Sequence, residues 1–188
     1  MAAFALLCGV LAGCRAPDVP GMGRTPAAST PVGGASDHSS SAPTSGGTAE
    51  LYIGTRASGF VQYPMDYEGD LTPEVLIQGI ADLTGWDLTL ADEVTTGKGG
   101  MSVCLSAQSA LFVGPPDPQK DRFRVYDGEQ LAEIILDSIQ KTLQMGFTGE
   151  GDDPDALDIY YFLEGEKPLE LPNLGLSWPI DQPYQWPA

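Results

Sequence analysis

Histidine and cysteine are scarce in this chain of 188 residues, and their scarcity excludes the commonest catalytic and metal sites. The chain contains one histidine, His38, and three cysteines, Cys8, Cys14 and Cys104. Ser-His-Asp and Cys-His catalysis therefore lack a general base in any folded region, and zinc motifs with His-Glu-x-x-His or cysteine pairs are missing. We expect no catalytic residues, no metal site and no cofactor.

Lysine and arginine are also scarce. The chain has 9 of them against 26 aspartates and glutamates, which gives a formal net charge of −17. The excess negative charge falls on residues 50–188, because the two arginines of residues 15–49 balance its two aspartates. Such a domain is repelled by nucleic-acid phosphates and by anionic lipid head groups. We predict no nucleic-acid binding.

Apolar runs are short, and none reaches the roughly 20 residues that a membrane-spanning helix needs. The uncharged run from Met1 contains Ala2-Ala3-Phe4-Ala5-Leu6-Leu7, typical of the apolar part of a signal peptide, and ends in Leu11-Ala12-Gly13-Cys14. This ending resembles the lipobox of bacterial lipoproteins, in which small residues admit the peptidase and the next thiol takes the lipid. We expect residues 1–13 to be a cleaved signal peptide and Cys14 to be lipidated. The alternatives are an ordinary signal peptide cut elsewhere and a buried N-terminal helix.

Residues 14–49 are predicted to be a disordered linker that follows the lipidated cysteine. Of the 35 residues from 15 to 49, 27 are Pro, Gly, Ser, Thr or Ala, and none is Phe, Trp or Tyr. Such a segment buries too little apolar surface to offset the entropy of ordering. His38 also lies in this linker. Because Cys8 would leave with the signal peptide and Cys14 would be lipidated, Cys104 is the one cysteine of the domain, and an intradomain disulfide is excluded. Because Cys104 lies in an apolar run, we expect a buried small side chain rather than a reactive thiol.

Residues 50–188 carry the signals of a single small α+β domain. The predicted strands are 51–53 and 60–63, joined by the Ser58-Gly59 turn, then 86–90, 101–105, 157–163 and 169–171. The first predicted helix has Thr72 as N-cap, Pro73 as its first residue and Gly85 as C-cap. The second begins after Asp127 and ends at Gly146. The order ββ-α-ββ-α-ββ predicts two helices packed on one largely antiparallel β-sheet.

Carboxylates are abundant in the domain, and two pairs of them are spaced closely in the sequence. Asp66 with Glu68, or Glu164 with Glu166, could serve a glycosidase, which needs no histidine. In a domain so rich in acids such pairs arise by chance, and we do not expect an enzyme. The acidic run at 152–155 lacks the alternating ligands of a calcium loop.

The C-terminal tail, from about residue 172, is rich in proline and aromatic residues. Trp178, Tyr184 and Trp186 combine large amphipathic rings with a stiff backbone. Either these rings cover the domain's own sheet, or they form an interaction surface for a partner or for glycan strands.

Several segments of the domain together carry a family resemblance. They are Leu51-Tyr52-Ile53, the Pro73-Glu74 helix, Met101 to Ser106 followed by Phe112, the helix from Leu131 to Leu143, and Ile159 to Gly165. Residues from about 50 to 175 thereby resemble the GerMN domain, the sporulation and spore-germination module of Gram-positive bacteria. The resemblance implies a small α+β fold related to ring-building motifs, a lipoprotein, and no catalytic residues. Cys104 departs from the family pattern, in which an acidic residue is usual.

The expected function is a non-enzymatic, lipid-anchored binding or assembly module. It would lie on the outer face of the cytoplasmic membrane, held there by the lipid on Cys14, and act in cell-envelope, sporulation or germination complexes. Its expected partners are envelope proteins or peptidoglycan. The alternative is a lipoprotein that binds peptidoglycan or hydrolyses cell-wall glycan with its carboxylates.

Overall fold

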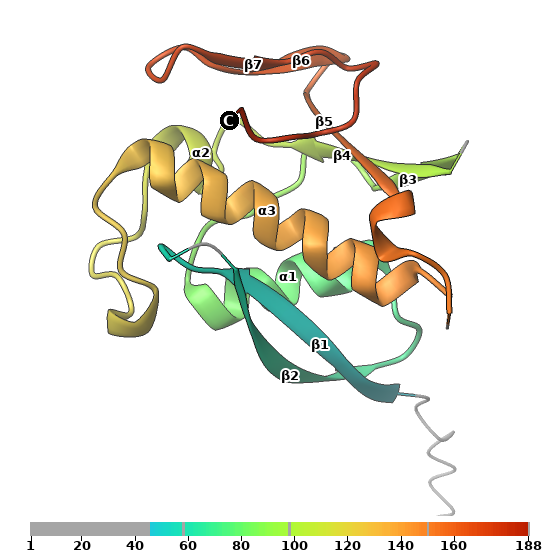
Figure 1. Ribbon diagram of the computed structural model, residues 1–188. Coiled ribbons are helices and arrows are strands. Elements are labelled where there is room, and N and C mark those ends of the chain that lie inside the picture. The colour runs from blue at the N-terminus through green and yellow to red at the C-terminus, as the bar shows by residue number, and fades with distance from the viewer. Residues whose placement is uncertain (1–45, 58, 98, 150, 188) are drawn as a thin grey trace, which may run out of the picture. The chain divides into compact units, whose positions relative to one another are not determined.

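The computed structural model describes residues 46–57, 59–97, 99–149 and 151–187 (Figure 1). The predictions for the signal peptide, for Cys14 and for His38 lie outside these residues. Within them, none of the helices combines the length and the apolar character that crossing a bilayer requires.

The described chain begins with a hairpin. Strands β1 (Gly46–Gly54) and β2 (Phe60–Glu68) pair antiparallel as a two-stranded sheet, which confirms the predicted hairpin. β1 starts before Glu50, the predicted start of the domain. Leu51 and Ile53 point from β1 into the hydrophobic core.

Helix α1 (Pro73–Thr84) forms as its capping residues predict. The Thr72 hydroxyl accepts the Val75 N–H at 3.3 Å, and Gly85 ends the helix in the left-handed conformation with φ 84°. Leu76 and Ile80 form its fully buried stripe.

Helix α3 (Gly128–Phe147) is the long central helix. Asp127 caps it as predicted, because its carboxylate accepts the Gln130 N–H at 2.8 Å. The predicted end at Gly146 is wrong, since the helix continues to Phe147. A Cβ on Gly146 would lie 2.7 Å from Cδ1 of Leu76, so a larger residue there would displace this buried side chain of α1.

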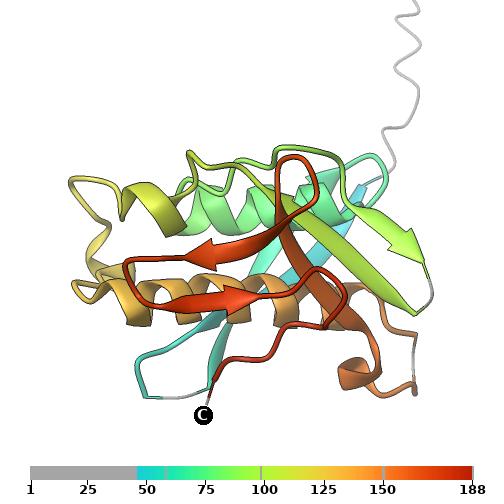
Figure 2. The same cartoon turned by 90° about the horizontal axis from the view of Figure 1, so that it is seen from above.

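Five further strands form the second sheet. They are β3 (Thr95–Gly97), β4 (Gly100–Leu105), β5 (Asp158–Leu163), β6 (Lys167–Leu171) and β7 (Leu176–Trp178), in the order β3-β4-β5-β6-β7. β4 and β5 are parallel and the other neighbours are antiparallel (Figure 2). Between them lie the short helices α2 (Ala110–Val113), η1 (Asp121–Phe123) and η2 (Pro154–Ala156).

The α+β class is confirmed, but the prediction of one sheet is wrong. Helix α3 runs between the β1–β2 hairpin and the five-stranded sheet and is buried on most of its sides (Figure 1). Two side-chain hydroxyls of α3 accept hydrogen bonds from the outer edge of β1. The Tyr52 N–H donates to Thr142 Oγ1 and the Gly54 N–H donates to Ser138 Oγ, both at 2.9 Å. Because a helix takes these hydrogen bonds, β1 cannot join the larger sheet.

The predicted strand at 86–90 does not form. Trp86 and Leu88 are buried as the alternation predicts, but the segment makes only an isolated bridge between Leu90 and Leu105. β3 pairs with the beginning of β4, from Gly100 to Ser102.

Pro64 makes the free edge of β2 a poor site for pairing with a further strand. The N–H groups of Tyr52 and Gly54 point away from β2, so the groups opposite them, at Gln62 and Phe60, point to the outer edge of the hairpin. Pro64 follows the same alternation and offers no N–H at that edge. Proline on an edge strand discourages pairing with another chain.

Candidate functional site

The C-terminal aromatic residues predicted as an interaction surface belong mostly to the core. Trp178 is 7% exposed and Tyr184 is 1% exposed, and Trp186 is partly buried against them. The Tyr184 ring packs edge-on against Tyr161 with 5.1 Å between centroids. The rings of Trp178 and Tyr184 therefore cover the domain's own sheet, and as a recognition patch they are excluded by burial.

Hydrogen bonds fix this tail in place. The Tyr184 hydroxyl donates to Asp137 of α3 at 2.7 Å, and the Tyr184 N–H donates to the Ile159 carbonyl of β5 at 2.7 Å. Trp178 Nε1 donates to the Gln185 carbonyl at 3.0 Å. The tail is thus bonded to both the central helix and the sheet.

The carboxylate pairs singled out from the sequence lie on the surface. Asp66 and Glu68 are exposed on β2 and line an open groove of about 690 Å³ between the hairpin and α1. Glu164 and Glu166 are exposed at the turn between β5 and β6. In the part of the chain that the structure describes, no group of three or more His, Cys, Asp or Glu side chains is placed to hold a metal ion.

Cys104 is fully buried in β4, as predicted. Burial, and next to it a hydrogen bond with Asp92, raises the pKa of its thiol to about 11. A thiol with such a pKa is a poor nucleophile at neutral pH.

A different site stands out, which we name the arginine cleft. It is a cleft of about 510 Å³ between the tip of the β1–β2 hairpin and the segment around η1. Its lining includes three arginines, an aromatic wall and an apolar floor: Arg56, Arg122 and Arg124, then Tyr63, Trp86 and Phe123, then Ile53, Val125 and Ile134.

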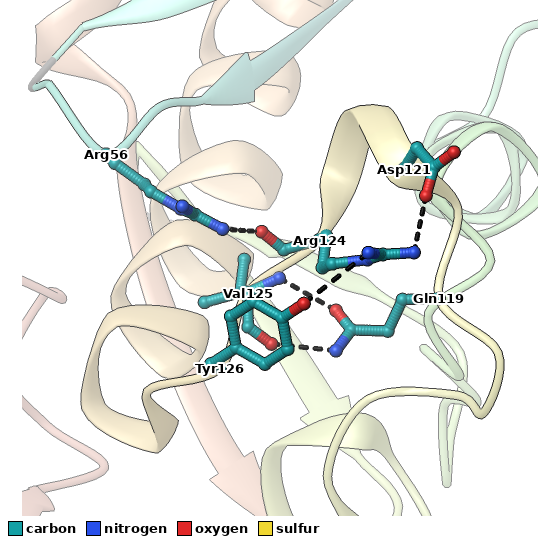
Figure 3. A network of polar contacts seen from close by, with 6 residues as sticks. All are labelled: Arg56, Gln119, Asp121, Arg124, Val125 and Tyr126. Atoms are coloured by element: carbon teal, nitrogen blue, oxygen red, sulfur yellow. Dashed lines mark hydrogen bonds and ion pairs between the residues drawn. The ribbon is translucent and has the colours of Figure 1, made fainter.

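The segment that carries two of these arginines is held at both ends. Lys120 Nζ donates to the carbonyls of Asp82 and Leu83, at 2.7 and 3.0 Å, and so caps the C-terminus of α1. The Gln119 side chain makes two 2.8 Å hydrogen bonds to the backbone of Val125, which is buried (Figure 3). The arginines therefore project from a fixed backbone.

Hydrogen bonds hold two of the guanidinium groups, those of Arg56 and Arg124, in place. Arg56 donates to the backbone carbonyl of Arg124, and Arg124 donates to the Asp121 carboxylate and faces the Tyr126 hydroxyl at 3.5 Å (Figure 3). Tyr126, and less strongly Asp121, raise the pKa of Arg124, which keeps its charge at any working pH. A guanidinium has five N–H donors, so these contacts leave donors for a ligand.

Three aromatic rings and the Arg122 guanidinium form one wall of the cleft. The guanidinium carbon of Arg122 lies 5.6 Å from the centroid of the Tyr63 ring, within cation–π range. Phe123 packs edge-on against Tyr63 at 5.7 Å and against Trp86 at 6.3 Å. Phe123 thus joins the Tyr63 and Trp86 rings into one aromatic wall.

The charge of the cleft contrasts with that of the chain. The described residues contain six lysines and arginines, namely Arg56, Lys120, Arg122, Arg124, Lys141 and Lys167, and the first four lie in or beside the cleft. In a protein of net charge −17 this is a local reversal of sign. Such a cleft attracts anionic groups that the rest of the surface repels.

Part of this basic cluster is visible in the sequence. Lys120, Arg122 and Arg124 stand within five residues of one another, which is a dense basic run for a chain with nine basic residues. Arg56 is distant in sequence, and only the folded hairpin brings it to Arg124.

No family model matches the chain, and neither a curated protein nor a solved structure matches it significantly.

Proposed function

We propose that this chain is a non-enzymatic, lipid-anchored binding module that holds an anionic partner of the cell envelope in the arginine cleft. The observation that carries the proposal is the gathering of three arginines around an apolar cleft in a strongly acidic domain. Ligand sites are typically of this size, with mostly apolar walls and a few convergent polar groups.

The chemistry of the lining favours binding over catalysis. Among the described residues that line the cleft, Asp121 is the acidic one, and it is ion-paired with Arg124. The remaining polar side chains are two hydroxyls, of Thr55 and Tyr63, and the guanidinium groups, all of which can donate hydrogen bonds to an anion.

The location and the complex are part of the same proposal. The lipobox ending at Cys14 supports an anchor on the outer face of the cytoplasmic membrane. The segments quoted above support a GerMN-like, ring-building-motif-like fold and a role in envelope, sporulation or germination complexes. We favour an envelope protein over peptidoglycan as the partner, because Trp178 and Tyr184 are buried and cannot stack on glycan.

Site-specific photo-crosslinking in cells tests the proposal. A photoreactive residue at Val61, which is 44% exposed and lines the cleft, should form an adduct with a discrete partner. The same residue at Ile180, which is 46% exposed and outside the cleft lining, is the matched control. Arg122→Glu should abolish the Val61 adduct, and Lys167→Glu, an equal charge change on β6, should leave it.

Two outcomes would contradict the proposal. The first is an adduct at Val61 that persists equally in Arg122→Glu and in Lys167→Glu. The second concerns the anchor: Cys14→Ala should move the chain from the membrane fraction to the soluble fraction, and a chain that stays with the membrane would exclude lipidation at Cys14 as its anchor.

A further inference from the structure

Resting on the proposed function, we infer the chemistry of the ligand: an acidic peptide segment with an aliphatic side chain beside its carboxylates. We further infer that Asp121 occupies, in the free protein, the place of one ligand carboxylate on Arg124. A binding partner would displace Asp121 and take over its ion pair.

The Asp121–Arg124 pair shows that this position accepts a carboxylate. The side chain of Asp121 is 91% exposed and that of Arg124 is 42% exposed. An ion pair so exposed contributes little to stability, so a ligand can replace it at small cost. Guanidinium groups bind carboxylates through paired N–H donors in a planar fork, and Arg122 and Arg56 offer further donors on the same cleft.

The walls argue for an aliphatic group rather than a sugar or a base. Stacking needs an open ring face, but Trp86 is buried and Arg122 lies over Tyr63. What the cleft offers instead is the exposed side chain of Val61 at its rim, beside the apolar lining residues Ile53 and Ile134, which are largely buried. A leucine or valine side chain would cover the exposed Val61 side chain, whereas a phosphate polymer would leave it in contact with water.

The negative charge of the domain adds specificity. An acidic peptide is repelled by the remaining surface of a chain with net charge −17, so it is attracted where Arg56, Arg122 and Arg124 stand together. Like-charge repulsion outside a complementary site suppresses wrong registers.

Fluorescence anisotropy with labelled hexapeptides and the full mature chain in detergent tests the inference. The probe is DLELDG, the neutral counterpart is NLQLNG, and the counterpart without leucines is DGEGDG. We expect DLELDG to bind at least about tenfold more tightly than either counterpart, a difference of about 1.4 kcal/mol. Arg122→Gln should weaken its binding by about two- to fivefold, in line with an exposed charge contact, and Lys167→Gln should not.

The role of Asp121 predicts a gain in affinity. Asp121→Asn removes the competing carboxylate and should strengthen DLELDG binding by about two- to fivefold. Glu170→Gln, the same charge change at an exposed site on β6, should leave the affinity unchanged. Val61→Asp at the rim should weaken binding without altering the thermal melt, which covers the case of an arginine variant that fails to fold.

The results that would contradict the inference differ from those that would contradict the proposed function. Equal binding of DLELDG and NLQLNG, or no gain in Asp121→Asn over Glu170→Gln, overturns the inference. Displacement of the probe by inorganic polyphosphate at lower concentration than by unlabelled DLELDG assigns the cleft to phosphate polymers and also overturns it. If the Val61 crosslink forms while no peptide binds, the ligand class is wrong and the binding module stands. If peptides bind and the crosslink is missing, the proposed function fails instead.

Discussion

Replacing Tyr184 should destabilise the whole domain, because this residue joins the C-terminal tail to the core. Its side chain is buried, packs on Tyr161 and Trp178, and donates to Asp137. If the tail were a peripheral recognition strap, the same replacement would be almost neutral.

Two substitutions separate the contributions of the ring and of the hydroxyl. Tyr184→Ala removes a buried aromatic ring, which costs about 3–5 kcal/mol in the free energy of unfolding. Tyr184→Phe keeps the ring and removes the donor to the Asp137 carboxylate, a hydrogen bond to a charged group worth about 1.5–3 kcal/mol. We expect the lower end for Tyr184→Phe, because burial already raises the pKa of Asp137 and eases its protonation.

Urea unfolding followed by tryptophan fluorescence measures the effect. With a slope of about 1.5 kcal/mol per molar, Tyr184→Ala should lower the midpoint by about 2–3 M. Tyr126→Ala is the matched control: Tyr126 is 80% exposed, and its replacement should change stability by less than about 0.5 kcal/mol. A midpoint for Tyr184→Ala within error of that for Tyr126→Ala would refute the assignment of the tail to the core.

Three further predictions concern the interior. Burial raises the pKa of Asp137, so its ionised form lowers the stability of the fold above that pKa. Asp137→Asn should therefore be more stable than wild type at pH 7, and thermal melts of both proteins should show the gain vanish as the pH falls towards about 4. Thr142→Val removes the hydroxyl that bonds both backbone groups of Tyr52, and should cost about 1–3 kcal/mol and speed hydrogen exchange of the Tyr52 amide; unchanged exchange would argue against the helix-capped edge. Cys104, buried and with its pKa raised to about 11, should react with a disulfide reagent only at the rate of unfolding, and rapid modification of the native chain would contradict its burial.

Local signals predicted the helices because helix ends depend on residues close in sequence. Thr72, Pro73 and Gly85 bound α1, and Asp127 begins α3, as the capping rules require. The one failure, Gly146, shows the limit of the rule: glycine ends a helix when it turns left-handed, but here it stays helical, where a Cβ would meet Leu76 of α1. The sequence does not reveal which of the two roles a glycine plays.

The arginine cleft could be predicted only in part. The basic run from Lys120 to Arg124 is visible in the sequence as a local reversal of charge. Tyr63 and Arg56 come from the hairpin and Trp86 follows Gly85, the C-cap of α1, so their distance from η1 depends on the folded chain. Likewise, Trp178 and Tyr184 have the composition of a binding surface, and only their burial assigns them to the core.

By itself, then, the sequence determined the α+β class, the caps of the two long helices, the first hairpin and the burial of Cys104, because each depends on neighbours or on apolar alternation. The tertiary structure alone decided that there are two sheets. Hydroxyls of Ser138 and Thr142 on α3 bind the edge of β1, and these residues are more than eighty positions away from their partners. Long-range pairing of this kind leaves no periodic trace in the chain, and for the same reason Arg56 meets Arg124 only once the protein has folded.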